Sequence, residues 1–193
     1  DKIHELVNFN ELVKKENRLM IGRDQELEQL FLTLCKKEKN NVLLIGKAGV
    51  GKTALVEKLA YKINHKEVPK LLQNKVIYEL SLSSIVAGTK YRGEFEEKFK
   101  KIIDKVIQAK DAILFIDEIH NLIGAGGAEG AIDASNILKP FLARKDLTLI
   151  GATTIEEYYK YFEKDQAMNR RFSILKINAV SYTHLTLPTI LRV

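Results

Sequence analysis

The chain has 193 residues, 46% of them hydrophobic and 29% charged, which suffices for the core of one globular domain. Its 31 Lys and Arg residues outnumber 25 Asp and Glu residues and give a net charge of +6, which permits contact with nucleic acid or an acidic membrane but requires neither, because the basic residues are scattered. The single cysteine, Cys35, excludes an intrachain disulfide and favours a reducing compartment, and the lack of an apolar run of roughly 20 residues argues against a membrane span.

Short apolar runs alternate with helical patterns along the chain. The runs predict five strands, at 41–46, 75–82, 111–117, 147–154 and 172–177, and their near-continuous apolar character is typical of strands covered on both faces. Helices are predicted at 24–37, 52–65, 93–109 and 133–143. Strands that alternate with helices predict an α/β fold with a parallel, doubly wound sheet.

The segment "GKAGVGKT", residues 46–53, fits the phosphate-loop pattern at every defined position and follows an apolar strand at the start of a helix. Gly46, Gly49 and Gly51 allow the backbone to curl so that its N–H groups face a triphosphate. Lys52 would neutralise the β- and γ-phosphates, and Thr53 would place its hydroxyl on magnesium. A glycine-rich turn that matches by chance is the alternative.

The run "AILFIDEIH", residues 112–120, predicts a strand that ends in two acids. A carboxylate at the carboxyl end of a parallel strand beside a phosphate loop can hold magnesium, which assigns Asp117 to the metal. Glu118 then lies where a base could polarise the attacking water. A solvated strand end is the alternative for the pair. We interpret His120 as a packing residue, because a lone histidine after a strand is more often packed than functional.

Several segments together resemble AAA+ proteins and, more narrowly, the first ATPase ring of the Clp unfoldases of the ClpC and ClpB types. These are "IGRDQELEQL" (21–30), the phosphate loop, "AGTKYRGEFEEKFK" (87–100), "FIDEIHNLIGAGGAEGAIDASNILKPFLAR" (115–144) and "LIGATTIEEYYKYFEKDQAMNRRF" (149–172). The likeness runs from about Leu19 to Ile177. It implies the P-loop AAA+ large subdomain, an α/β unit with a five-stranded parallel sheet sandwiched by helices, and without the helical lid.

The resemblance also implies roles for residues outside the phosphate loop. Thr154 matches the sensor that reads the γ-phosphate or the water, and Arg170 and Arg171 match arginine fingers that reach a neighbouring subunit's nucleotide. The nucleotide-binding set it implies is Ile21, Gly22, Gly46, Ala48, Gly49, Val50, Gly51, Lys52, Thr53 and Asp117. From the residues alone, Thr154 could be a cap or turn residue, the arginine pair a solvated charge cluster, and "IGRD" a helix entry capped by Asp24.

The family's pore loop matches "KYRG", formed by Lys90, Tyr91, Arg92 and Gly93. In the Clp family this loop projects into the central pore of a hexamer, where its aromatic ring grips a threaded polypeptide, and flanking glycines would let it move. The alternatives are a tyrosine folded onto its own domain and a ring that stacks on a nucleic-acid base. The glycine-rich segment 124–130 matches a second pore loop.

The chain departs from the family pattern in three places. Lys47 and Ala48 replace the usual residues of the phosphate loop, but backbone amides make the cradle, so binding should survive. The lead-in "ENRLMIGRD" lacks the usual Asp-Pro step. The sequence of the tail 179–193 does not fit the helical lid that follows at this point in the family, and we interpret it as non-native sequence. An extra strand or a partner-binding tail is the alternative. The expected parts are therefore a lead-in at 1–20, the ATPase subdomain at 21–178 and this tail.

The predicted function is an ATP-driven protein unfoldase or disaggregase that hydrolyses ATP with Mg²⁺ and threads polypeptides through a hexamer pore. The alternatives are an AAA+ nucleic-acid motor or loader and a non-hydrolysing nucleotide-binding scaffold. The resemblance implies a homo-hexamer and unfolded or aggregated protein substrates, leaves a Clp peptidase partner open, and argues against nucleic acid and membranes as partners. The expected compartment is a bacterial cytoplasm or the stroma of a plastid-type organelle, and the isolated, truncated monomer should be a weak ATPase.

Overall fold

The computed structural model describes residues 4–16, 22–123, 135–143 and 145–179. In these ranges six strands form one sheet in the order β1-β3-β4-β5-β2-β6. The strands are β1 (Leu6–Asn8), β2 (Asn41–Ile45), β3 (Val76–Leu80), β4 (Ala112–Ile116), β5 (Thr148–Thr153) and β6 (Phe172–Lys176). All neighbours from β3 to β6 run parallel, whereas β1 pairs antiparallel with β3 at one edge.

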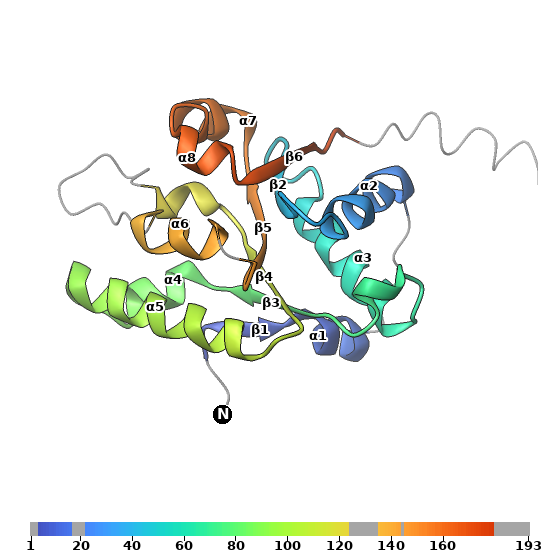
Figure 1. Cartoon of the computed structure of the whole chain (residues 1–193), viewed down its shortest axis with the longest axis horizontal. Coiled ribbons are helices and arrows are strands. Elements are labelled where there is room, and N and C mark those ends of the chain that lie inside the picture. Colours follow the sequence, from blue (N-terminus) through green and yellow to red (C-terminus); the bar gives the residue numbers. More distant parts are fainter. Residues whose placement is uncertain (1–3, 17–21, 124–134, 144, 180–193) are drawn as a thin grey trace, which may run out of the picture.

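Helices cover both faces of this sheet (Figure 1). The longer ones are α1 (Phe9–Glu16), α2 (Asp24–Leu34), α3 (Lys52–Asn64), α5 (Arg92–Gln108) and α6 (Ser135–Ala143). The shorter ones are α4 (Leu82–Ala87), α7 (Ile155–Glu157), α8 (Gln166–Asn169), the 3-10 helices η1 (Lys70–Leu72) and η2 (Ile119–Leu122), and the π-helix η3 (Tyr158–Phe162). None of the helices in the described ranges is long and apolar enough to cross a membrane.

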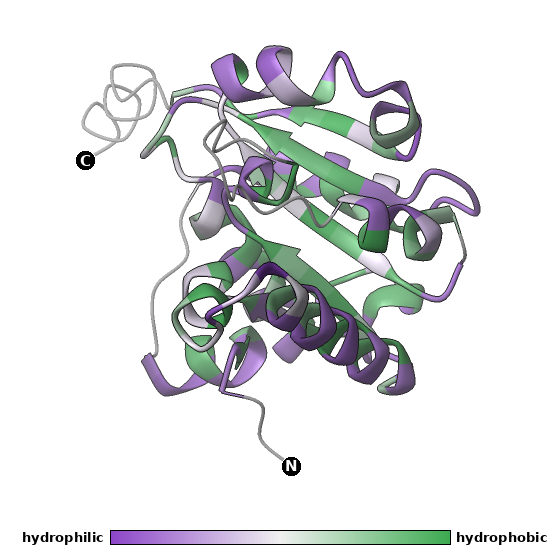
Figure 2. Ribbon diagram, turned by 90° about the vertical axis from the view of Figure 1, so that its left-hand side faces the viewer, coloured by the Kyte–Doolittle hydropathy of each residue, from purple (hydrophilic) through white to green (hydrophobic). Residues whose placement is uncertain are grey.

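Each face of the sheet buries its own hydrophobic core. One core joins the sheet to α1, α2 and α3, and includes Phe9 and Phe115. The other joins it to α5, α6 and η3, and includes Phe99 and Phe162. All five residues of β2 are buried, as expected of a strand near the middle of a sheet that is covered on both sides. Figure 2 shows the strands as the most hydrophobic elements and polar residues on the outer faces of the helices.

The α/β class and the five predicted parallel strands are confirmed, and the sheet has one strand more than predicted. The additional strand, β1, has only the three residues "LVN", too few for an alternating pattern to be visible in the sequence. β1 and α1 both lie in the predicted lead-in, yet Phe9 and Val13 of α1 are each only 2% exposed in the core. The ordered lead-in is therefore part of the same folded unit.

The start of α2 differs from the predicted cap. Its N-cap is Arg23, in the left-handed region at φ 64°, with no side-chain capping bond, and Asp24 is the first helical residue. The carboxylate of Asp24 instead accepts a hydrogen bond from Lys58 Nζ at 2.7 Å. The ion pair keeps the pKa of Asp24 below its usual value, with the hydrogen bond from Lys58 as the largest cause. The prediction of Asp24 as the N-cap was wrong, because its carboxylate forms an ion pair with the buried Lys58 of α3 and makes no capping hydrogen bond.

The sheet order decides where the candidate site forms. β4, β5 and β2 are adjacent and parallel, so their carboxyl ends meet at one edge of the sheet. The phosphate-loop segment follows β2, the two acids follow β4, and Thr154 follows β5. Three motifs that are far apart in the sequence therefore converge, as ligand sites of open α/β sheets generally do.

Candidate functional site

A cavity of about 260 Å³ lies at this edge of the sheet. Its wall combines the phosphate loop and the first turn of α3 with the acidic turn after β4 and the end of β5. The lining residues are Ala48, Gly49, Gly51, Lys52, Thr53, Ala54, Asp117, Glu118, His120, Thr153 and Thr154. Most of the residues predicted to bind nucleotide or to act on it are thus brought to one small cavity.

The phosphate loop has a backbone path that needs glycine. Gly49 and Gly51 have φ values of 76° and 110°, in a region that other residues rarely adopt. At Gly46 the constraint is space, because a Cβ there would lie 2.5 Å from the backbone oxygen of Ile177. Val50, which belongs to the loop without lining the cavity, donates its N–H to the carbonyl of Lys47 at 3.2 Å and closes the turn. The loop is therefore a tight turn whose path depends on its glycines.

Gly46→Ala is expected to destabilise the fold by about 1–3 kcal/mol, the usual cost of adding a methyl group to a filled space. The clash is with backbone, which cannot rotate away. Gly93→Ala is the matched control, because Gly93 has open space around it and lies within α5, where alanine is favoured by about 0.5–1 kcal/mol. Urea unfolding followed by circular dichroism measures both. Equal effects of the two changes would contradict the steric account.

Lys52 lies at the N-terminus of α3 and is only 9% exposed. Its Nζ donates to the carbonyl of Gly46 at 2.6 Å and to that of Lys47 at 3.1 Å, so the ammonium folds over the loop. Burial lowers the pKa of Lys52, and the charges of Asp117 and Glu118 oppose that shift. A buried cation beside the positive end of a helix favours an anionic ligand, such as a phosphate.

Thr53 and Asp117 place two side-chain oxygen atoms at the same point of the cavity. The hydroxyl of Thr53 donates to Oδ2 of Asp117 at 3.3 Å, although the two residues are 64 positions apart. A hydroxyl and one carboxylate fit Mg²⁺, which is usually held by one or two protein oxygens together with phosphates and water. No cluster of three or more His, Cys, Asp and Glu residues that could hold a metal occurs among the residues the structure describes.

Glu118 follows Asp117 on a strained backbone, with φ 48° in the left-handed region. Its own N–H donates to Oδ1 of Asp117 at 2.9 Å, which ties the turn to the preceding carboxylate. Oε2 of Glu118 accepts a hydrogen bond from the side chain of Asn121 at 3.4 Å. Glu118 is exposed and lines the cavity.

The carboxyl end of β5 forms the facing wall of the cavity. The hydroxyl of Thr154 accepts the N–H of Glu157 at 3.1 Å and caps α7, so Thr154 is both a cap and a lining residue. Thr153 and His120, which the sequence did not assign to the site, also line it and lie in contact, with 2.9 Å between Thr153 Oγ1 and His120 Nδ1. The packing interpretation of His120 is incomplete, because the ring lies in the cavity wall.

The segment before α2 is fixed by two cations. Lys58 donates to the carbonyl of Gly22 and pairs with Asp24. The guanidinium of Arg23 donates to the carbonyl of Val50 at 2.5 Å and to that of Asn178, so it joins the phosphate loop to the chain that leaves β6. Gly22 does not line the cavity, and Ile21 lies outside the described residues. No motif in the sequence would have identified Arg23 or Lys58 as residues that fix this segment.

The two predicted arginine fingers lie away from this cavity and differ from each other. Arg170 is exposed at the end of α8. Arg171 is partly buried, donates from Nη1 to the carbonyl of Ala167 at 2.9 Å, and has a buried Nε without a hydrogen-bond partner in the described part of the chain. The helix that carries them is fixed by Asp165, which caps it and pairs with Lys139 at 2.9 Å.

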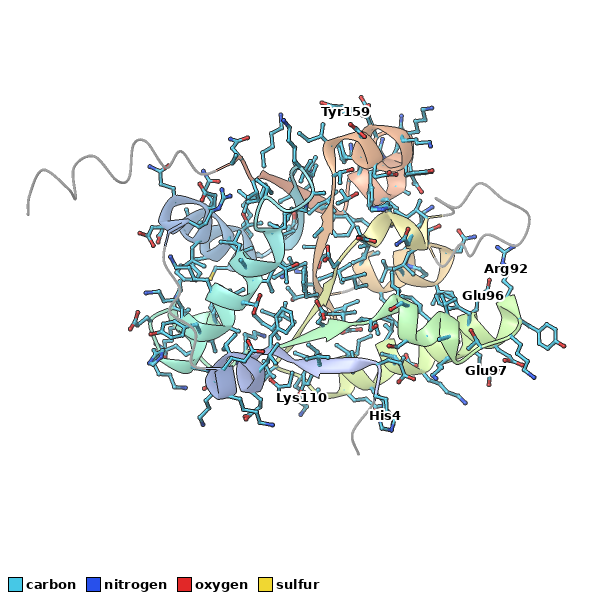
Figure 3. All side chains as sticks on the ribbon, turned by 180° about the vertical axis from the view of Figure 1, so that it is seen from behind. His4, Arg92, Glu96, Glu97, Lys110 and Tyr159 are labelled. Atoms are coloured by element: carbon cyan, nitrogen blue, oxygen red, sulfur yellow. The ribbon has the colours of Figure 1, made fainter. Side chains whose placement is uncertain are left out.

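The predicted pore-loop residues lie at the start of α5. Tyr91 is the N-cap of this helix and is 71% exposed, so it is not folded onto its own domain. Arg92 and Gly93 already belong to α5, and Arg92 pairs with Glu96 at 3.1 Å. Figure 3 shows Arg92 projecting from one end of the helix, far from Lys110 beyond the other end. The second predicted pore loop, 124–130, and the tail from residue 180 lie outside the described residues.

Comparison with known proteins agrees with this geometry. Residues 42–177 match the family described as "ATPase family associated with various cellular activities (AAA)". The chain is 54% identical over 171 residues to the "Negative regulator of genetic competence ClpC/MecB" of Bacillus subtilis, with 88% of this chain and 21% of that protein covered. It is 55% identical over 165 residues to the "Chaperone protein ClpB" of Wolinella succinogenes, with 84% and 19% covered. The chain thus spans about a fifth of the length of these curated relatives.

Solved structures give the same result. The closed state of Hsp104 with ATPγS and FITC casein superposes with a TM-score of 0.83 at 39% identity, covering 97% of this chain and 32% of Hsp104. The ADP complex of Saccharomyces cerevisiae Hsp104 superposes with a TM-score of 0.82, also at 39% identity. The family match over residues 42–177, the ClpC and ClpB relatives and the Hsp104 structures together show that the chain belongs to the AAA family of ATPases, in its Clp branch.

Proposed function

We propose that this chain is the large ATPase subdomain of the first ring of an ATP-driven protein unfoldase or disaggregase. Residues 21–178 would form this subdomain, with the ordered lead-in packed onto it and the tail from 179 foreign to it. The observation that carries the proposal is the convergence of Thr53, Asp117 and Glu118 on one cavity beside a phosphate loop. The family match and the Clp relatives support the same activity.

The residues predicted to form the site would then divide the chemistry of ATP hydrolysis among them. Backbone N–H groups of the loop and Lys52 would hold the phosphates of ATP. Thr53 and Asp117 would hold Mg²⁺, which would supply positive charge to neutralise the phosphates. Glu118 would accept a proton from the attacking water. Thr154 would contact that water or the terminal phosphate, and Arg170 or Arg171 would contact the nucleotide of an adjacent subunit in a homo-hexamer.

The exposed ring of Tyr91 supports polypeptide as the substrate. It is 71% exposed and stands between Lys90 and Arg92 at the start of α5. A large amphipathic ring can contact many kinds of side chain without selecting a sequence. Unfolded or aggregated proteins are therefore the proposed substrates. From the Clp relatives we further propose a Clp peptidase as a partner and a bacterial cytoplasm as the compartment.

Tyr91→Ala in the full-length protein is expected to lower the unfolding rate of a fluorescent protein substrate about tenfold, the change that 1.4 kcal/mol of lost contact energy produces. The reason is that the ring would grip the substrate during translocation. Tyr159→Ala is the matched control, since Tyr159 is a tyrosine with 51% exposure on η3, outside the proposed loop (Figure 3). Fluorescence loss in the presence of ATP measures both.

The same assay separates the alternatives. Stimulation of ATP hydrolysis by unfolded casein that is lost in Tyr91→Ala would support threading of polypeptide. Stimulation by single-stranded DNA that survives this change would instead support a nucleic-acid motor. No hydrolysis by the assembled full-length protein under any condition would leave a nucleotide-binding scaffold and contradict the proposal.

A further inference from the structure

The imidazole of His120 lies in the wall of the nucleotide cavity, and the proposed hydrolysis gives it no task. It belongs to η2, just beyond the acidic turn, and its Nδ1 lies 2.9 Å from Oγ1 of Thr153, the last residue of β5. The carbonyl of Thr153 in turn accepts the N–H of Gly46 at 3.2 Å. The imidazole therefore links the turn after β4 to the end of β5. Thr153, at the end of β5, is also hydrogen-bonded to Gly46, the first residue of the phosphate loop.

The contact with Thr153 decides which ring nitrogen carries the proton. Thr153 is 1% exposed, and in the described part of the chain its hydroxyl has no acceptor other than His120 Nδ1. A buried hydroxyl that does not donate leaves an unsatisfied polar hydrogen, which is costly. Donation by the Thr153 hydroxyl to Nδ1 satisfies this hydrogen and places the proton of a neutral ring on Nε2.

The surroundings of His120 favour that neutral form. Burial is the largest influence and lowers the pKa of the ring, and the nearby Lys52 lowers it as well. The carboxylates of Glu157, Glu118 and Asp117 act in the opposite direction but do not outweigh burial. Near neutral pH the ring therefore carries one proton, and Nε2 makes no hydrogen bond within the described ranges.

We infer that His120 is a ligand-contacting residue whose Nε2–H donates a hydrogen bond to the terminal phosphate of a bound nucleoside triphosphate, with Thr153 holding the ring in the required tautomer. This inference rests on the proposed nucleotide site. His120 lines the same cavity as Asp117 and Glu118, and the charges of both carboxylates act on its ring. A phosphate oxygen is an anionic acceptor that a neutral N–H donor can contact without a change of protonation. The contact would let the end of β5 distinguish triphosphate from diphosphate.

Binding of magnesium AMP-PNP and magnesium ADP to the 193-residue chain tests the phosphate contact by calorimetry. His120→Phe keeps the ring but lacks the donor, and it is expected to weaken AMP-PNP about tenfold, the order of loss for one hydrogen bond to a charged group, and ADP much less. His120→Gln, whose amide can donate, should restore most of the difference. His65→Phe is the control, because His65 lies outside the cavity and contacts Tyr61. Equal weakening of both nucleotides by His120→Phe would overturn the inference.

The tautomer is tested separately by long-range ¹⁵N–¹H spectra of the histidine rings. The unsubstituted chain is expected to show His120 protonated on Nε2, and Thr153→Val to show both tautomers. Protonation on Nδ1, or of both nitrogens at neutral pH, would overturn the inference even if nucleotide binds. Failure of the unsubstituted chain to bind either nucleotide would instead overturn the proposed function, and the phosphate contact with it, whatever tautomer the spectra show.

Discussion

Glu118→Gln is expected to lower ATP turnover by the full-length protein about 10²–10⁴-fold, the usual contribution of a general base, while the nucleotide still binds. Glutamine fills the same space but cannot accept the proton of the attacking water. Binding should persist because Lys52, Thr53 and the loop backbone remain in place. Steady-state release of phosphate and the affinity for a fluorescent ADP measure the two effects independently.

Two comparisons make this result specific to Glu118. Glu163→Gln removes an exposed carboxylate outside the cavity and should leave turnover unchanged. Lys52→Ala should instead abolish binding, since among the residues that the structure describes it removes the one buried ammonium that lines the cavity. Turnover that survives Glu118→Gln would show that the water is activated by another group and would contradict the assignment.

Arg170→Ala is expected to lower ATP turnover about 10³–10⁵-fold in the assembled full-length protein, as for other arginines that act across an interface. Arg170 is exposed and free to reach a neighbour, whereas Arg171 is held through Nη1 by the carbonyl of Ala167. We therefore expect Arg171→Ala to reduce the melting temperature of the domain more than Arg170→Ala does. Lys164→Ala, which removes an exposed cation near the same helix, is the control for charge alone.

Mixing of two inactive variants tests whether the arginine acts on the adjacent subunit. Subunits with Arg170→Ala keep an intact cavity, and subunits with Glu118→Gln keep an intact arginine. A mixed assembly then contains complete sites wherever the two kinds meet in the productive order, so turnover should return. If the mixture stays as inactive as its components, Arg170 does not act in trans.

The parallel strands were predictable because burial on both faces leaves a near-continuous apolar run in the sequence. The strand β1 was not, since its three residues carry no periodic pattern and it is held by pairing with β3, a contact between distant segments. The helical segment from α7 to α8 was missed for a related reason. It consists of a three-residue helix, a π-helical turn and a four-residue helix, none of them long enough to show a helical period in the sequence.

The candidate site likewise has parts that the sequence predicts and parts that it does not. The phosphate loop and the two acids are local patterns, and parallel strand order alone brings them together. The contact between His120 and Thr153 depends on a 2.9 Å distance between residues that are 33 positions apart, which no local pattern encodes. Arg23 is a similar case, because its bonds to the carbonyls of Val50 and Asn178 exist only once the sheet has formed.

The position of Tyr91 has a mechanical consequence. Its carbonyl accepts the N–H of Phe95 at 3.1 Å, so the tyrosine is fastened to the first turn of a 17-residue helix. That helix is a stiff rod about 26 Å long, and its buried side, which includes Phe99 and Ile103, is clamped against the sheet. A force on the ring is therefore transmitted through α5 to β4, the strand that directly precedes Asp117.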